Sequence, residues 1–182
     1  SVFFALAILS KTSTVVIPLI VFCLDRWILK VPWQKSARAT FPWLLCSLPV
    51  LWLTNGSQPM SKMQYVTPIW GRPIIAADTI LFYLSKAIFP VFLAPDYART
   101  PQHVLSHPWG YVSVLVLTLL FALFHRRDPK WKALFLIFVL SLLPVLGLVS
   151  FFFQFFSTVA DRYLYLPLFS AALALTWSLT SQ

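Results

Sequence analysis

Ala160-Asp161-Arg162-Tyr163-Leu164-Tyr165-Leu166-Pro167 places an acid and a base side by side between two apolar runs, 151–156 and 168–179. Ionised groups are costly in hydrocarbon, so they gather at interfaces, at cavities or at binding sites. Two tyrosines follow the charged pair, and such rings suit the headgroup zone of a bilayer, where the hydroxyl stays in water. The octapeptide 160–167 therefore predicts a membrane surface with a functional role.

The composition favours the same class of protein. The chain is 59% hydrophobic and 10% charged, whereas a soluble domain carries roughly 25% charged residues. It contains no Glu. The net charge is +9, but the basic residues form short clusters between apolar runs, as in loops that face the cytosol or anionic lipid. We expect an all-α polytopic membrane protein with the lipid bilayer as a partner, and no binding of nucleic acid.

A spanning helix needs about 20 mainly apolar residues. One truncated span and five further spans are predicted: 1–9, 13–29, 40–54, 109–124, 133–150 and 163–180. The segment 73–89 mixes Asp78 and Lys86 with apolar residues, which is typical of a helix that lies in the interface. The predicted fold thus has about five to six transmembrane helices plus an interfacial or re-entrant helix.

Two basic loops predict the sidedness. Lys30, Lys35 and Arg38 lie in one loop, and Arg126, Arg127, Lys130 and Lys132 lie in the other. The positive-inside rule puts both in the cytosol, which leaves 55–108 as an extracytoplasmic loop with the interfacial helix. If 73–89 crosses the membrane instead, one end of the chain inverts. We expect an integral, multi-pass protein of the bacterial inner membrane or the endoplasmic reticulum membrane.

Three blocks of sequence carry a family resemblance. They are Leu9–Lys11 with Val15–Pro18 and Leu24–Trp27; Phe82–Lys86 with Pro90, Leu93–Pro95 and Tyr97; and Leu143–Val149 with the octapeptide. In this order they resemble the membrane part of the transmembrane, tetratricopeptide-repeat-containing O-mannosyltransferase-like proteins and their bacterial relatives, in the GT-C class. The last block is the specific one.

The resemblance implies an enzyme that moves a mannose-like sugar from a polyprenyl-phosphate carrier to a hydroxyl group of a protein, a glycan or another acceptor. The transfer would take place on the extracytoplasmic face. Residues 1–182 would then be a partial GT-C transmembrane domain. Its catalytic carboxylate, in the first loop, would lie before Ser1, and its repeat region beyond Gln182. Ser1 already lies in an apolar stretch, so we expect missing upstream sequence. The catalytic residue stays unknown, and activity of the 182 residues alone stays open.

Arg162 and Lys11 are the predicted ligands of the lipid phosphate. A lipid-linked sugar leaves behind an anion, and a guanidinium can hold its oxygens with two parallel hydrogen bonds. Lys11 lies on the same predicted face and could share that charge. The structural alternatives are pairing of Arg162 with Asp161, and snorkelling of either cation to ordinary lipid.

Five further residues are predicted to support the site: Asp161, Tyr163, Tyr165, Lys86 and Asp96. Asp161 could orient Arg162, bind a metal or help position the acceptor, or instead interact with the dipole of the last helix. The tyrosines could contact the sugar or only line the interface.

No cofactor is predicted beyond the lipid-linked donor. His103 and His107 have the spacing of a helical zinc pair, but prolines flank them and no acid or Cys stands at fixed spacing, so no metal is expected. A transporter or flippase of a lipid-linked or anionic solute is the alternative function. The uncharged middles of the last three predicted spans favour surface chemistry instead.

Overall fold

The structure, a computed structural model, describes residues 2–57, 67–125 and 128–180, and all regular secondary structure in these ranges is helical. The chain divides into two compact units, Ser1–Gln58 and Pro59–Gln182. Ser1, the stretch 58–66 of the expected long loop and the basic pair Arg126 and Arg127 lie outside the described residues.

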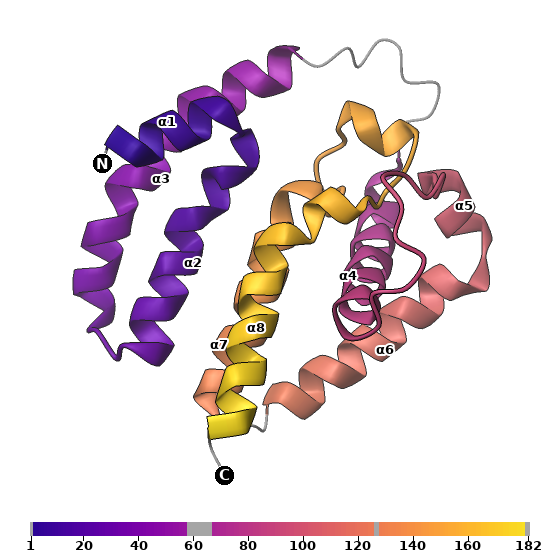
Figure 1. Cartoon of the computed structure of the whole chain (residues 1–182). Helices are drawn as coiled ribbons and strands as arrows, with labels where there is room; N and C mark the ends of the chain where they lie inside the picture. The colour runs from indigo at the N-terminus through magenta and orange to yellow at the C-terminus, as the bar shows by residue number, and fades with distance from the viewer. Residues whose placement is uncertain (1, 58–66, 126–127, 181–182) are drawn as a thin grey trace. The chain divides into compact units, whose positions relative to one another are not determined.

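The first unit contains two α-helices that run along a third (Figure 1). Its elements are α1 (Val2–Ser10), the 3-10 helix η1 (Thr12–Val16), α2 (Ile17–Cys23), the π-helix η2 (Leu24–Ile28) and α3 (Trp33–Ser57). The rings of Phe4 and Trp43 stack with centroids 5.2 Å apart, which joins α1 to α3. Ser36 Oγ donates to Asp25 Oδ2 over 2.9 Å and ties η2 to α3.

The second unit packs α4 against α6 and α7 against α8, with the short α5 next to both α4 and α6 (Figure 1). Its α-helices are α4 (Arg72–Ile88), α5 (Pro101–Ser106), α6 (Pro108–His125), α7 (Pro129–Leu142) and α8 (Tyr165–Thr180). Its 3-10 helices are η4 (Ile69–Gly71), η5 (Leu143–Val145), η6 (Phe152–Phe155) and η7 (Asp161–Tyr163).

The core of the second unit joins α4 and α7 to the irregular segment before α8. It contains Ala76, Ile80, Tyr83, Phe138, Leu142, Leu146, Val159 and Leu164. The α4 members repeat every three or four residues, so one stripe of this amphipathic helix faces the core. This burial, at about 25 cal/mol per Å² of apolar surface, is the main force that fixes α4 beside 159–164.

One glycine sets how closely α5 and α6 approach. A Cβ at Gly110, in the first turn of α6, would lie 2.7 Å from the carbonyl oxygen of Val104 in α5. Real Cβ atoms avoid such a distance, so a side chain here would push the two helices apart.

Within the described part of the chain, none of the helices is both long enough and apolar enough to cross a membrane. The predicted polytopic membrane fold, with five to six transmembrane helices, is therefore wrong, and so is the predicted integral multi-pass location. The segment 73–89, expected to lie in the membrane interface, is α4 (Arg72–Ile88), and its Ile75 to Ile80 stretch is buried against the rest of the second unit.

Breaks within the apolar runs explain the error. The run 13–29 divides into η1, α2 and η2, and 133–150 stops being α-helical at Leu142, two residues before Pro144, which has no N–H to continue an α-helix. Helix α8 has 16 residues, below the length of a span. Helix α3 is long, but it begins with polar and basic residues and holds Pro42 and Pro49 in its interior.

Candidate functional site

Two predicted site residues of the second unit, Lys86 and Asp161, contact the segment 89–100, which follows α4 without helical structure. Lys86, in the last turn of α4, donates to the carbonyl oxygens of Val91, at 2.5 Å, and Phe92, at 3.1 Å. Its ammonium also lies 5.0 Å from the centroid of the Tyr97 ring. Two of its three N–H donors therefore bind carbonyl oxygens of the turn after α4. In this structure Lys86 stabilises that turn.

Asp161 fixes the other side of the same segment. Its Oδ1 accepts a hydrogen bond from the Tyr97 hydroxyl over 2.8 Å, and its Oδ2 accepts one from the backbone N–H of Ala94. Both carboxylate oxygens thus hold a segment more than sixty positions away in sequence. Burial, followed by the hydrogen bond to Asp161, raises the pKa of Tyr97 above its ordinary value, because both disfavour the phenolate.

Tyr83 anchors the residue before Asp161. Its side chain is fully buried in the core, where its hydroxyl donates to the Ala160 carbonyl over 3.0 Å and accepts from the Ala160 N–H over 2.8 Å. Burial raises the pKa of Tyr83 well above its ordinary value. Asp161 is thereby fixed both through its own carboxylate and through its neighbour's backbone.

Arg162 is held differently from its neighbours. Its side chain is exposed, and its guanidinium carbon lies 4.0 Å from the centroid of the Phe153 ring and 5.0 Å from that of Tyr163. One Nη2–H donates to the Tyr163 hydroxyl over 3.2 Å. Among residues 67–125 and 128–180 no carboxylate pairs with it, so the predicted alternative of an Asp161–Arg162 ion pair does not occur. The aromatic face orients a cation whose remaining N–H donors point to no acceptor of the described chain.

The other predicted residues have separate places. Tyr163 is partly buried and meets the Phe153 ring edge-on, while Tyr165, at the start of α8, is 75% exposed. Asp96 is exposed, and its Oδ1 accepts from the Ala98 N–H two residues on. Lys11 is exposed between α1 and η1 in the first unit, so its pairing with Arg162 stays a prediction.

A second polar cluster, which the sequence analysis did not identify, surrounds Asp78. This side chain is 3% exposed; its Oδ1 is 2.6 Å from Arg99 Nη2 and accepts from Ser113 Oγ over 3.2 Å. It is the one ion pair among the described residues. An acid on the apolar stripe of α4 signals that a partner is needed, but nothing in the sequence selects Arg99 over the other cations.

An apolar cavity of about 780 Å³ lies between α4, α7 and α8. It begins near Leu84 and Leu168 and continues along α8 to Ser178. Leu168 is one to two helical turns beyond Arg162, so a cationic group and a long apolar hollow lie at neighbouring positions of the same segment.

The His103 and His107 rings are close, with centroids 4.2 Å apart, and His107 Nδ1 is 2.9 Å from the His103 carbonyl oxygen. In the part of the chain that the structure describes, no three His, Cys, Asp or Glu side chains gather as a metal site would require.

Comparison of the chain with family models, with curated proteins and with solved structures finds no match.

Proposed function

We propose that this chain binds a polyprenyl-phosphate-linked sugar and transfers the mannose-like sugar to a hydroxyl group of a protein or other acceptor. The observation that carries the proposal is the state of Arg162: it is exposed, it has no carboxylate partner among the described residues, and the Phe153 ring orients it. When the sugar leaves, negative charge develops on the carrier phosphate. A guanidinium placed there in advance stabilises that charge with two parallel hydrogen bonds.

Asp161 supports this role by being engaged elsewhere. Because Tyr97 and the Ala94 N–H satisfy its carboxylate, it does not neutralise the adjacent guanidinium. The acid therefore holds the 89–100 segment, while Arg162 is left for an external anion. Asp78 is buried and ion-paired, so neither acid is proposed as the catalytic base.

The cavity between α4, α7 and α8 suits the remainder of such a donor. Its volume of about 780 Å³ falls within the ~300–1,000 Å³ of small-molecule sites. Its walls are aliphatic and aromatic side chains, together with the hydroxyls of Ser170 and Ser178. An isoprenoid chain would replace water there, at a gain of about 25 cal/mol per Å² of buried apolar surface.

The test is sugar transfer by the protein expressed from its own gene, with mannose supplied on a polyprenyl phosphate. We expect Arg162→Ala to lower turnover by about 100-fold, the effect of removing one donor to a developing oxyanion. Arg162→Lys keeps the positive charge but cannot donate two parallel hydrogen bonds, so it should recover only part of the rate. Arg38→Ala, at an exposed arginine of α3, is the matched control and should leave turnover unchanged. Equal turnover by Arg162→Ala and the wild type would refute the proposal.

A further inference from the structure

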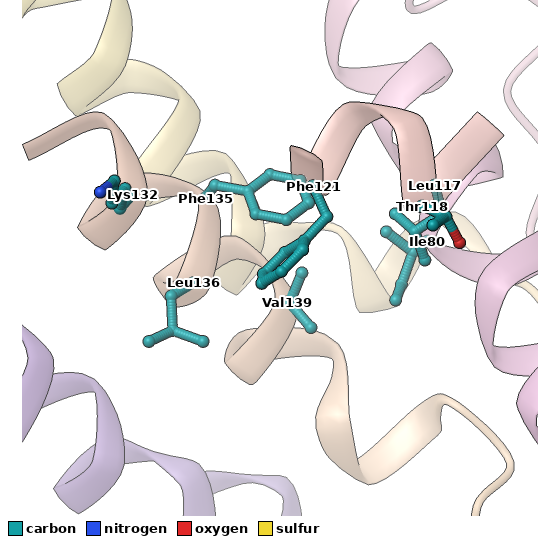
Figure 2. Close-up of a pocket in the computed structure, with 8 residues that line it drawn as sticks. All are labelled: Ile80, Leu117, Thr118, Phe121, Lys132, Phe135, Leu136 and Val139. Atoms are coloured by element: carbon teal, nitrogen blue, oxygen red, sulfur yellow. The ribbon is translucent and has the colours of Figure 1, made fainter. Parts of the chain in front are cut away.

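A second apolar cavity, of about 420 Å³, lies between α4, α6 and α7 (Figure 2). Three helices build it, and its lining residues are Ile80 of α4, Leu117, Thr118 and Phe121 of α6, and Lys132, Phe135, Leu136 and Val139 of α7. Phe121 and Phe135 lie together in the middle of the view, with Lys132 at the end away from Ile80. The cavity is thus an apolar hollow with a cation at one end.

The lining has two polar side chains, Thr118 and Lys132, and only the Lys132 ammonium carries a charge. Thr118 Oγ1 donates to the Val114 carbonyl of its own helix over 2.7 Å, so its hydrogen is already used. Lys132 is partly buried, and the structure gives its ammonium neither a carboxylate nor a carbonyl partner among the described residues. A lysine that lays its stem on apolar surface needs a counter-charge or water for its head.

The surroundings of Lys132 also favour an anion. Lys132 lies in the first turn of α7, where the helix dipole attracts negative charge. The nearest acid in sequence, Asp128, is exposed and caps α7 by accepting from the Lys130 N–H over 2.9 Å. Lys130 itself turns to the Trp177 ring, 3.7 Å from its centroid. Among the described residues, Lys132 is therefore the one cation that lines the cavity.

We infer that this cavity binds a single-chain fatty acid, with the alkyl chain between the two phenylalanines and the carboxylate at Lys132. One compact ammonium matches one negative charge, whereas a phosphate dianion is typically held by an arginine fork or several donors. The volume of about 420 Å³ lies in the range of small-molecule sites, roughly 300–1,000 Å³. This site is independent of the proposed sugar transfer, because among the described lining residues it has Phe135 alone in common with the cavity between α4, α7 and α8.

The test is equilibrium dialysis of dodecanoate, dodecanol and dodecyl phosphate against the 182-residue chain, below the concentrations at which they form micelles. We expect dodecanoate to bind with a stoichiometry of one and at least about tenfold more tightly than dodecanol, because a charge-assisted contact is added. Lys132→Met keeps the stem and removes the charge, so it should make the two affinities equal. Lys130→Met, two residues away on α7, is the matched control and should preserve the difference.

A second variant tests the hollow itself. Thr118→Trp places a large ring at an exposed α6 position that lines the cavity, and it should abolish binding of both dodecanoate and dodecanol. Equal affinities of the wild type for dodecanoate and dodecanol would overturn the proposal. So would equal losses in Lys132→Met and Lys130→Met, full binding by Thr118→Trp, or tighter binding of dodecyl phosphate than of dodecanoate.

Discussion

Two aspartates of the second unit hold separate parts of the chain together in opposite ways. Asp78 belongs to α4, whereas Asp161 binds the segment 89–100 that follows α4. Asp78 is 3% exposed and pairs with the Arg99 guanidinium at 2.6 Å. Asp161 is partly exposed, pairs with no cation of the described residues, and is held by a hydroxyl and a backbone N–H. The first arrangement uses an arginine for stability. The second leaves the arginine next to it, Arg162, available for a ligand.

Removal of the buried acid is expected to have the largest effect. Asp78→Ala leaves the Arg99 guanidinium without its counter-charge in a largely apolar setting, so we expect the free energy of unfolding to fall by about 3 kcal/mol. This estimate lies at the low end for buried pairs because Arg99 is 29% exposed and can turn to water. Urea denaturation followed by circular dichroism measures the loss.

The double variant Asp78→Leu with Arg99→Met separates charge from packing. Replacing both partners by apolar groups of similar size is often nearly neutral, so stability should return to within about 1 kcal/mol of the wild type. If the double variant is as unstable as Asp78→Ala, the ion pair is not what matters at this position.

The sequence predicted the positions of the helices better than their lengths, and it wrongly predicted that they cross a membrane. The expected segment 73–89 corresponds to α4 (Arg72–Ile88) and 109–124 to α6 (Pro108–His125), because long apolar periodicity reports helix directly. The run 133–150 was expected as one helix, yet α7 ends at Leu142. Hydropathy does not reveal the change from α-helix to 3-10 helix at Leu143–Val145. The apolar run was therefore predicted as a longer helix than the structure contains.

The charged residues around the 89–100 segment could be picked out from the sequence, but their contacts could not. Asp161, Arg162 and Lys86 were identified as charges at the ends of apolar runs, and the structure brings Asp161 and Lys86 to the two sides of the 89–100 segment. Asp161 meets Tyr97 across 64 positions of sequence, and Asp78 meets Arg99 across 21. Such partners follow from the packing of α4 against the irregular segments, which no local pattern encodes.

Tyr83→Phe tests how firmly the segment before Arg162 is anchored. The change removes one hydroxyl and leaves the buried Ala160 N–H without its partner, while the Ala160 carbonyl keeps the hydrogen bond from the Tyr163 N–H, so we expect a local loss of about 2 kcal/mol. Hydrogen exchange of the Ala160 amide should quicken by about 30-fold, as 1.4 kcal/mol corresponds to a factor of ten. Tyr111→Phe, at an exposed tyrosine, is the control; unchanged exchange at Ala160 would show that the anchor lies elsewhere.

Asp161→Asn is expected to cause the smallest loss of stability. Its effect should be clearest in the pH dependence of the free energy of unfolding. The amide can still accept one hydrogen bond but loses the negative charge, so the free energy of unfolding should fall by about 1 kcal/mol at neutral pH. The pKa of Tyr97 should fall as well, because burial would remain as the cause of its elevation once the carboxylate is gone.

The sign of the pH effect follows from the raised pKa of Tyr97. In the unfolded chain tyrosine loses its proton near pH ~10, and in the folded chain Tyr97 keeps it to higher pH. Stability is therefore complete below pH ~10 and declines as the pH rises towards the folded-state pKa, because the unfolded state then binds fewer protons. Asp161→Asn should flatten that decline, whereas Asp96→Asn, which removes an exposed carboxylate one residue from Tyr97, should leave it as it is. Tyrosinate absorbance during an alkaline titration follows Tyr97 directly, with Tyr97→Phe as the blank, and an unshifted Tyr97 titration in Asp161→Asn would mean that the carboxylate does not hold this segment in solution.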